Sequence, residues 1–253
     1  FKQKTAYERL RSLVGSEMCI RDRQHIPRLL YRLGFSLQRP RKLLARADAE
    51  AQRQWLEVKL PAIKKKSPKA EGRVFEDEAS FWLDGTLHQT WSEVGTQPRV
   101  PTYGLRKTAH VFGAVAVQDA SFVYQFADIF NGHTFHEFLL TVVKHYARQK
   151  VFMVIDNGPC HWLDEAGKRW LAENLDKIEL FRLPPYSPEF NPVEGIWKTT
   201  RQMTTHNCLY PTVAERDTAL CHTFETFREN PRLIDNQVAR FRVLQIGADN
   251  IVM

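Results

Sequence analysis

VFMVIDNGPCH, residues 151–161, opens with five consecutive apolar residues and then turns polar at Asp156. An uninterrupted apolar run of this length is typical of a strand buried on both faces, as in the interior of a parallel sheet. Ligands of open α/β sheets collect beyond the carboxyl ends of the strands, so Asp156 stands where functional side chains are usually found. The alternative is that Asp156 only begins the turn made by Asn157, Gly158 and Pro159.

The segments around this strand alternate between helix and strand patterns. Residues 134–148 and 163–174 carry apolar side chains at helical spacing. Strand patterns occupy residues 108–117, 122–127 and 178–181, and the short QDAS turn between the first two favours a hairpin. A hairpin, which is antiparallel, beside a strand that is buried on both faces indicates a mixed sheet flanked by helices.

The stretch RVFEDEASFWL, residues 73–83, alternates with a period of two. Asp77 therefore shares one face of a strand with apolar residues such as Phe75, while Glu76 and Glu78 fall on the other face. Burying an unpaired carboxylate is costly, so Asp77 needs a cation, a helix N-terminus or solvent at the rim of a site. A salt-bridged or edge-strand aspartate is the structural alternative.

The stretch PPYSPEFNPVEGIWK, residues 184–198, places four prolines ahead of a helical pattern. Asn191 suits the N-cap, Pro192 the first helical position and Glu194 the third, which is the spacing of a reciprocal capping box. Glu194 thus has a structural explanation. The stiff approach also suits a metal-binding carboxylate that must be held in one orientation, and the two roles are compatible.

Charge is distributed unevenly along the chain. Residues 24–73 hold 13 Lys and Arg against 4 Asp and Glu, whereas residues 74–253 hold 17 against 22. A basic arm is the electrostatic footprint of a protein that binds a phosphate backbone, although basic runs are often only solvated. The candidate DNA-binding residues of this arm are Arg39, Arg41, Lys42, Lys64, Lys65 and Lys66.

Two helices are expected in the basic arm. Residues 26–33 carry apolar side chains at helical spacing, and Gly34 suits a helix stop, which is consistent with the last helix of a small DNA-binding unit. A second helix over about residues 45–58 has alternating charges, which predicts a solvated connector leading through Pro61 to the next domain.

The first 23 residues look unlike a protein segment. FKQKTAYE and SLVGSEMCIRD resemble translated sequencing-library adapters, with Arg9 as the departure from the adapter frame. We therefore exclude residues 1–23 from fold reasoning and expect the natural chain to be truncated upstream. A genuine amphipathic N-terminus is the alternative.

Several classes of protein and site are disfavoured by the sequence. No apolar run reaches the roughly 18 residues of a membrane span, so we expect a soluble protein without a membrane partner. The four cysteines form no CxxC pair, which favours a reducing cytoplasm over a disulfide or zinc framework. No phosphate-cradling GxxxxGK[ST] loop occurs.

Other site chemistries also lack support. His133 and His136 have no nearby third zinc ligand, and Cys160 beside His161 is a weak nucleophile pair because adjacent side chains seldom face each other. Paired acids also serve glycosidases, but the basic arm favours a phosphate polymer.

Three blocks, FEDEASF, IDNGPCH and PPYSPEFNPVEGIWK, together resemble the signature blocks of bacterial insertion-sequence transposases of the mariner superfamily, which carry a DDE triad. In this chain 37 residues separate Asp156 from Glu194. The order of predicted elements is that of a ribonuclease H-like fold. We therefore expect an α/β protein with a ribonuclease H-like mixed sheet flanked by helices and a helical basic N-terminal arm.

The resemblance implies a division of the chain into four parts. Residues 1–23 would be non-native, and residues 24–73 would be the remnant of a helix-turn-helix DNA-binding region with its linker. Residues 74–205 would form the catalytic domain, and residues 206–253 a C-terminal helical extension.

The resemblance also implies the chemistry. Asp77, Asp156 and Glu194 would be the catalytic residues and would bind two Mg²⁺ or Mn²⁺ ions, with Asp77 bridging both. Such a pair of ions stabilises the oxygens that enter and leave phosphorus during strand cleavage and strand transfer. Supporting roles, in orienting a carboxylate or contacting phosphate, would fall to Asn157, His161 and Lys198; an ordinary turn Asn, a surface His and a surface Lys are the alternatives.

The partners implied are double-stranded DNA, as transposon ends and target, and a second copy of the chain in an active homodimer. The protein would work in the bacterial cytoplasm, at the nucleoid. The rival hypothesis is a truncated or repurposed relative that binds DNA without cleaving it. The intact acids favour the enzyme, and the altered N-terminus favours the rival.

Overall fold

The computed structural model describes residues 25–36, 48–67 and 72–242. The chain divides into two compact units, residues 1–43 and residues 44–253.

Helix α2 (His25–Arg32) lies in the described part of the first unit. Gly34 follows it with φ of 81°, a left-handed conformation that glycine adopts without strain. The predicted helix and its stop at Gly34 are confirmed. The adapter-like residues 1–23 lie outside the described residues, and so do the candidate DNA-binding residues Arg39, Arg41 and Lys42.

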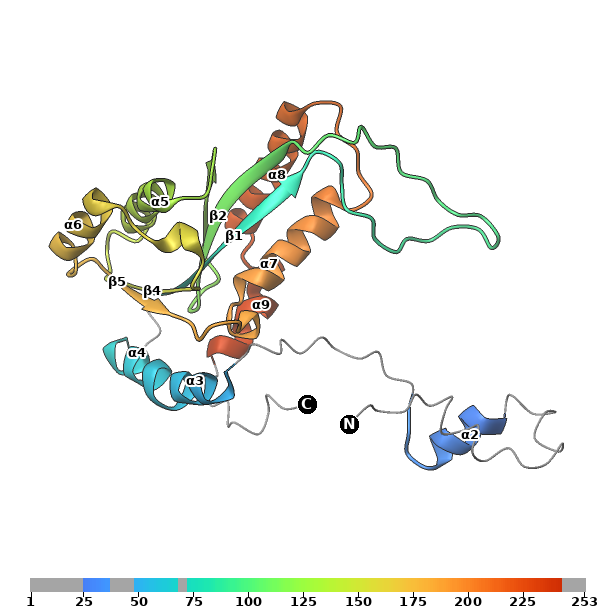
Figure 1. The fold of residues 1–253 in the computed structure, drawn as a ribbon, viewed down its shortest axis with the longest axis horizontal. Coiled ribbons are helices and arrows are strands. Elements are labelled where there is room, and N and C mark those ends of the chain that lie inside the picture. Colours follow the sequence, from blue (N-terminus) through green and yellow to red (C-terminus); the bar gives the residue numbers. More distant parts are fainter. Residues whose placement is uncertain (1–24, 37–47, 68–71, 243–253) are drawn as a thin grey trace. The chain divides into compact units, whose positions relative to one another are not determined.

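The second unit is built on a five-stranded mixed sheet with the strand order β3-β2-β1-β4-β5 (Figure 1). β1, β2 and β3 are antiparallel neighbours, whereas β4 runs parallel to both β1 and β5. In chain order the strands span Arg73–Trp82, Thr108–Ala116, Phe122–Ala127, Val151–Ile155 and Ile178–Arg182. All five residues of β4 are buried, so the predicted two-sided strand of a parallel sheet is confirmed.

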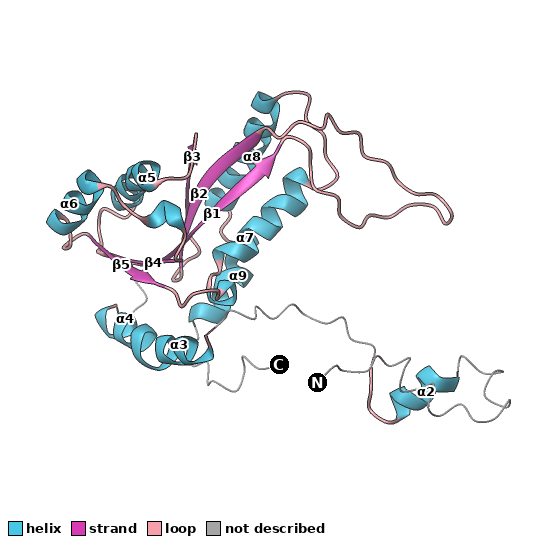
Figure 2. Cartoon of the chain, in the orientation of Figure 1, coloured by secondary structure: helices cyan, strands magenta, loops and turns pink. Residues whose placement is uncertain are grey.

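Helices cover both faces of this sheet (Figure 2). One face packs against α5 (Gly132–His145) and α6 (Glu165–Glu173). The other packs against α7 (Val193–Thr200), α8 (Val213–Glu229) and α9 (Arg232–Arg242). The mixed sheet flanked by helices is the fold class that the sequence predicts.

The alternation of β1 divides its side chains between the two hydrophobic cores. Phe75 and Phe81 belong to the core on the α7 side, and Val74 belongs to the core on the α5 side. Asp77 is therefore directed to the α7 side of the sheet, and Glu76 and Glu78 to the α5 side. This confirms the period-two pattern predicted for the strand.

The predicted C-terminal helical extension contains α8 and α9, and residues 243–253 lie outside the described residues. Phe224 of α8 and Val238 of α9 are fully buried in the same core as β1. These helices are therefore part of the second compact unit.

The connector predicted over residues 45–58 differs from expectation. One continuous helical segment runs through α3 (Ala49–Gln54), the π-helix η2 (Trp55–Lys59) and α4 (Leu60–Lys66). It is not a solvated connector, because Trp55, Leu60 and Ile63 are buried in the core. The chain also passes Pro61 without leaving the helix. The Leu60 N–H bonds five residues back to the Trp55 carbonyl, and Pro61 then occupies the first turn of α4, where its missing N–H costs little.

A long irregular loop, residues 85–107, joins β1 to β2 and extends away from the sheet (Figure 1). Its base is tied down by Asp84, whose carboxylate accepts the backbone N–H groups of Tyr103 and Leu105, each at 3.0 Å. These bonds lower the pKa of Asp84.

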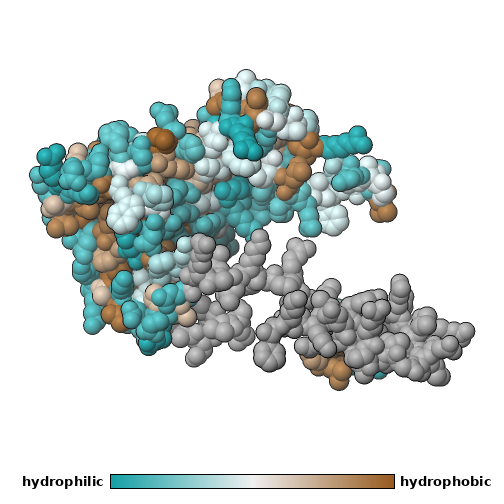
Figure 3. Space-filling view, viewed as in Figure 1, coloured by the Kyte–Doolittle hydropathy of each residue, from teal (hydrophilic) through white to brown (hydrophobic). Residues whose placement is uncertain are grey.

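The visible surface is mixed in character. Hydrophobic residues lie among hydrophilic ones in small separate groups (Figure 3), as is normal for a folded protein in water. Among the described residues, no helix has the length and apolar character to cross a membrane.

Candidate metal centre

Asp77, Asp156 and Glu194 line a single cavity of about 360 Å³. One wall of the cavity is the proline-rich loop over residues 183–188, and another is the turn at Asn157. The three acids lie far apart in sequence and come from three different elements. Folding therefore brings together the acids that the sequence singles out.

Two of the acids are placed by the strand register. β1 and β4 are parallel neighbours, and the last pair of residues that lie opposite each other in these strands is Phe75 and Val154. Asp77 and Asp156 each follow that pair by two residues, so they emerge at the same level of the sheet. Asp156 is the first residue after β4, at the carboxyl end of that strand.

Glu194 is the second residue of α7, and its predicted capping box is wrong. The backbone N–H of Asn191 donates to the Pro188 carbonyl at 2.9 Å and not to Glu194. The Asn191 side chain instead accepts the Val193 N–H at 3.2 Å. The Glu194 carboxylate is thus released from capping and lines the cavity.

The proline-rich loop is braced from the helical segment that precedes β1. Gln52 donates to the Ser187 hydroxyl and to the Glu189 carboxylate, both at 2.9 Å. Trp55 stacks on Phe190, with ring centroids 5.5 Å apart and planes inclined by 10°. The loop that delivers Glu194 is therefore stiffened by prolines and supported from outside.

Asp77 lies deep in the cavity wall, with 8% of its surface exposed. Its Oδ2 accepts a hydrogen bond from Trp197 Nε1 at 3.0 Å. Burial raises the pKa of Asp77 well above its ordinary value, and the negative charges of Glu194 and Glu76 raise it further. The sequence shows that Asp77 needs a partner, but it gives no sign that this partner is the Trp197 indole.

Burial likewise raises the pKa of Glu194, although Arg201 acts in the opposite direction. Arg201 and Glu194 also line a second cavity of about 350 Å³, next to Trp82. Burial is thus the first cause of the raised pKa of both acids, and the negative charges of neighbouring carboxylates add to it.

Asp156 is held by His161, which lies behind it. His161 Nδ1 is 2.8 Å from Asp156 Oδ1, and His161 Nε2 is 2.8 Å from Glu76 Oε2. The Gly158 N–H donates to the same Asp156 oxygen at 2.6 Å. One oxygen of Asp156 is thus fixed by the protein, and His161 is a buried bridge rather than a surface residue.

The charges of this bridge follow from burial and pairing. Burial works against a charged His161, but the adjacent Glu76 and Asp156 outweigh it, so the pKa of His161 is raised. The pKa of Asp156 is lowered, because His161 and the Gly158 N–H outweigh the effect of burial. For Glu76 burial prevails over His161, so its pKa is raised.

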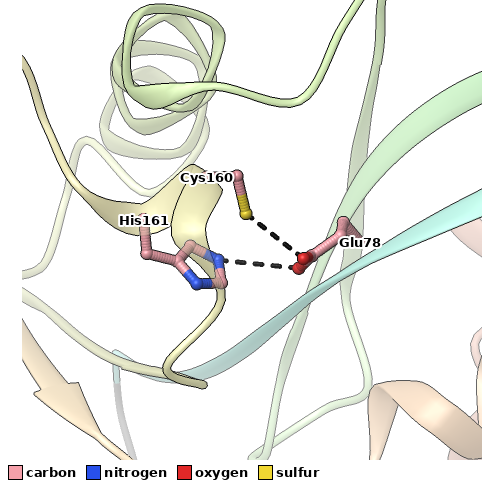
Figure 4. A group of neighbouring side chains, drawn as sticks. All are labelled: Glu78, Cys160 and His161. Atoms are coloured by element: carbon pink, nitrogen blue, oxygen red, sulfur yellow. Dashed lines mark hydrogen bonds and ion pairs between the residues drawn. The ribbon is translucent and has the colours of Figure 1, made fainter.

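Glu78, Cys160 and His161 form a further group of side chains beside this bridge (Figure 4). Their potential ligand atoms lie within 4.8 Å of one another, and Cys160 Sγ donates to Glu78 Oε1 at 3.2 Å. The expectation that Cys160 and His161 would not face each other is therefore wrong. Burial raises the pKa of the Cys160 thiol to about 11, however, so the protonated thiol is a poor nucleophile and a poor ligand.

The other residues that the sequence singles out lie at the cavity, on α7 and on α4. Asn157 lines the cavity and donates to the Leu183 carbonyl at 2.8 Å, which ties the loops after β4 and β5 together. Lys198 is exposed one turn beyond Glu194. Lys64 and Lys65 lie in α4 with Lys66, which pairs with Glu179.

The His133 ring lies 3.6 Å from the Glu137 carboxylate and 3.8 Å from the Asp164 carboxylate. The group of three potential metal ligands found among the described residues within 4.8 Å of one another, Glu78, Cys160 and His161, includes neither His133 nor His136.

Arg182 is a residue that the sequence does not single out. It donates to the backbone carbonyls of Asp156 and His161, each at 3.2 Å, and its guanidinium lies 4.6 Å from the centre of the Trp162 ring. The last residue of β5 therefore fixes the loop that carries Asp156.

Known proteins resemble this chain in sequence and in fold. Residues 73–215 match the family described as DDE superfamily endonuclease, and residues 22–59 match the winged helix-turn-helix family. The Tc3 transposase of Caenorhabditis elegans is 27% identical over 169 residues, which make up 62% of this chain and 50% of that protein. The chain thus spans about half the length of this relative.

Solved structures of the Mos1 transposase share the fold. The Mos1 strand transfer complex superposes with a TM-score of 0.64 at 16% identity, covering 87% of this chain and 66% of that one. The Mos1 mariner paired end complex with Mn gives 0.65 at 14% identity, with 87% and 67% covered. The catalytic domain of Mos1 gives 0.53 at 14% identity, with 81% and 93% covered.

Proposed function

Because the chain belongs to the DDE superfamily of endonucleases, we propose that Asp77, Asp156 and Glu194 form the metal-binding centre of a transposase that cleaves DNA strands and joins them to a target. The observation that carries this proposal is the convergence of three acids, from β1, the end of β4 and the start of α7, on one cavity.

The residues fit a divalent cation. Burial and mutual repulsion raise the pKa values of Asp77 and Glu194, so a bound cation would relieve a charge that the protein leaves uncompensated. Carboxylate oxygens are the ligands that Mg²⁺ and Mn²⁺ prefer. Two such ions would supply Lewis-acid stabilisation of the oxygens at phosphorus and activation of water or a 3′-hydroxyl.

Each acid comes from a different part of the fold. Asp77, in the middle of β1, would hold the cations together with Asp156, after β4, and Glu194, on α7. His161 would orient Asp156 through the 2.8 Å contact between its Nδ1 and one carboxylate oxygen. Asn157 holds the neighbouring loop in place, and the exposed Lys198 would contact a DNA phosphate.

We also propose that the partner is double-stranded DNA. The winged helix-turn-helix match over residues 22–59 overlaps the basic arm, and the Mos1 structures of the same fold are paired end and strand transfer complexes. Residues 24–73 would bind DNA, including through Arg39, Arg41, Lys42, Lys64, Lys65 and Lys66. An active homodimer, an origin in a bacterial insertion sequence and action at the nucleoid belong to the same proposal, as does the division at residues 23, 73 and 205.

A cleavage assay tests this function. The chain is incubated with an end-labelled DNA duplex and either Mg²⁺ or Mn²⁺, and the products are separated on a denaturing gel. We expect nicked strands with the unsubstituted chain, none with Asp156→Ala, and nicking with Asp176→Asn. The control removes an exposed acid from the turn before β5, at the opposite end of that strand from the cavity.

The same assay distinguishes a DNA-cleaving enzyme from a relative that binds DNA without cleaving it. A duplex that is bound but never nicked by the unsubstituted chain with either metal would contradict the proposed activity. Nicking that persists unchanged in Asp156→Ala would contradict the assignment of the centre.

A further inference from the structure

We propose that Trp197 is a positioning residue that fixes the Asp77 carboxylate for metal binding, and that Gly113 is required because it leaves room for the Trp197 ring. The inference rests on the proposed function, since it treats Asp77 as a metal ligand. It adds two residues, from α7 and β2, that hold this ligand without touching the metals themselves.

The hydrogen bond from Trp197 to Asp77 is well shielded. Trp197 is 1% exposed and Asp77 is 8% exposed, so water competes little for the 3.0 Å contact between Nε1 and Oδ2. An indole N–H only donates, so it favours the ionised carboxylate as acceptor. Within the described part of the chain no other group donates to Asp77, which leaves its second oxygen for the cavity that it lines.

The position of the indole ring depends on Gly113. The antiparallel register pairs Asp77 directly with Gly113 on β2. A Cβ atom at Gly113 would lie 2.4 Å from Cη2 and 2.7 Å from Cζ2 of Trp197, closer than real side chains approach. The ring therefore lies against bare backbone beside the acid it orients.

Neighbouring rings hold the indole in this orientation. Phe81 and Phe122 meet it nearly edge-on, with centroids 5.9 and 6.0 Å away and interplanar angles of 74° and 76°. Phe224 completes the contact at 6.2 Å and 74°. Since these packed rings restrict rotation of Trp197, the direction of its N–H is set before any metal arrives.

Trp197 also couples two ligands. It lies three residues after Glu194 on α7, which places both side chains on the same side of the helix. A single helix thus supplies the third acid and the donor that orients the first. The contact of Trp197 with Asp77 therefore contributes to the separation between Asp77 and Glu194.

The competing explanation is that Trp197 only fills the core. Measuring Mn²⁺ affinity of the full chain by isothermal titration calorimetry separates the two roles. Trp197→Phe keeps an aromatic ring and loses the N–H donor. Trp170→Phe is the matched control, because Trp170 packs on the opposite face of the sheet, where its ring contacts His136.

We expect Trp197→Phe to weaken Mn²⁺ binding by about 10- to 100-fold, as for other residues that orient a metal ligand. Trp170→Phe should bind Mn²⁺ as the unsubstituted chain does. Equal Mn²⁺ affinity in the two variants would overturn the inference.

A second comparison uses Gly113. Gly113→Ala should lower both the melting temperature and the Mn²⁺ affinity, because the new methyl displaces the indole. Adding Trp197→Phe removes the ring atoms that clash, so the melting temperature should recover while the Mn²⁺ affinity stays at the level of Trp197→Phe alone. Recovery of both quantities would mean that Trp197 acts by packing only.

Measuring Mn²⁺ binding by Asp77→Asn as well shows whether a negative result contradicts the positioning role of Trp197 or the proposed metal centre itself. If Asp77→Asn binds Mn²⁺ as tightly as the unsubstituted chain, the proposed centre is wrong. If Asp77→Asn loses binding while Trp197→Phe behaves like Trp170→Phe, the centre stands and only the positioning role falls.

Discussion

The side-chain amide of Asn191 donates to the backbone carbonyl of Glu76 at 2.8 Å, and it thereby joins the loop before α7 to the strand that carries Asp77. Asn191 is buried, and its amide oxygen accepts the Val193 N–H as well. One side chain thus sets the spacing between two of the three acid-bearing elements.

Replacing Asn191 by alanine should leave both of these backbone groups without a partner in a buried place. We expect the free energy of unfolding to fall by about 1–3 kcal/mol and Mn²⁺ binding to weaken, because Glu194 loses its tether to β1. Urea denaturation and calorimetry measure the two effects. Asn174→Ala removes a half-buried amide that bonds the Trp170 carbonyl at the end of α6, and it should change stability less and leave Mn²⁺ binding intact. Equal effects in both variants would contradict the role given to Asn191.

Neutralising an acid of the cavity should have opposite effects with and without metal. In metal-free buffer, Asp77→Asn should stabilise the fold by about 0.5–2 kcal/mol, because it removes a buried charge that nearby carboxylates repel. The rise in melting temperature on adding Mn²⁺ should be smaller in Asp77→Asn and Glu194→Gln than in the unsubstituted chain. Differential scanning fluorimetry gives both readings, with Asp176→Asn as the control. A full metal-induced rise in both cavity variants would remove these acids from the metal site.

The base of the loop over residues 85–107 should loosen in mild acid. His88 and His206 stack with ring centroids 4.7 Å apart, and burial, followed by the charge of His88, lowers the pKa of His206 below its ordinary value of 6.5. A histidine with a lowered folded pKa contributes stability above its unfolded pKa, and that contribution is lost as the pH falls through the folded value.

The free energy of unfolding should therefore fall between pH 7.5 and 5.5, and fall less in His206→Gln, which cannot become charged. Urea denaturation at the two pH values measures the difference. His222→Gln, on α8, serves as the control for loss of a histidine elsewhere. The same acid-induced loss in His206→Gln as in the unsubstituted chain would rule this explanation out.

The helical segment before β1 should behave as core. Ile63→Ala removes a buried side chain, so we expect a loss of about 2–5 kcal/mol in the free energy of unfolding. Val58→Ala, at a position 64% exposed on the same segment, should change it by no more than about 0.5 kcal/mol. Urea denaturation of the pair tests the assignment, which fails if Ile63→Ala is as mild as Val58→Ala.

The sheet could be predicted from the sequence because its signals are local. Val151 to Ile155 are all apolar and lie between two parallel strands, and the residues of β1 alternate as their two faces require. The three acids could also be singled out from the sequence. Asp77 interrupts the apolar face of a strand, Asp156 follows an apolar run, and Glu194 follows a proline-rich stretch.

The helical segment before β1 is buried in the core, although the sequence predicts a solvated connector, and this difference has a physical reason. Trp55, Leu60 and Ile63 are separated by five and then three residues, and the first interval is one turn of a π-helix. A search for a repeat of 3.6 residues does not register that interval, so the alternating charges dominated the interpretation.

The support around the acids could not be read from the sequence, because it is made by contacts between distant residues. Trp197 and Asp77 are 120 positions apart. Glu76 looked like a residue of a polar face, but α5 covers that face, and the buried carboxylate then meets His161. The sequence therefore gives the type of each residue, but it does not predict which distant residue each side chain contacts.

The brace that Gln52 and Trp55 place on the proline-rich loop gives the second unit a mechanical property. Force applied to the polypeptide ahead of Asp48 would reach these two side chains first and, through them, the segment that presents Glu194. Tension on the residues ahead of Asp48 would thus be transmitted, through the contacts of Gln52 and Trp55, to the loop that precedes Glu194.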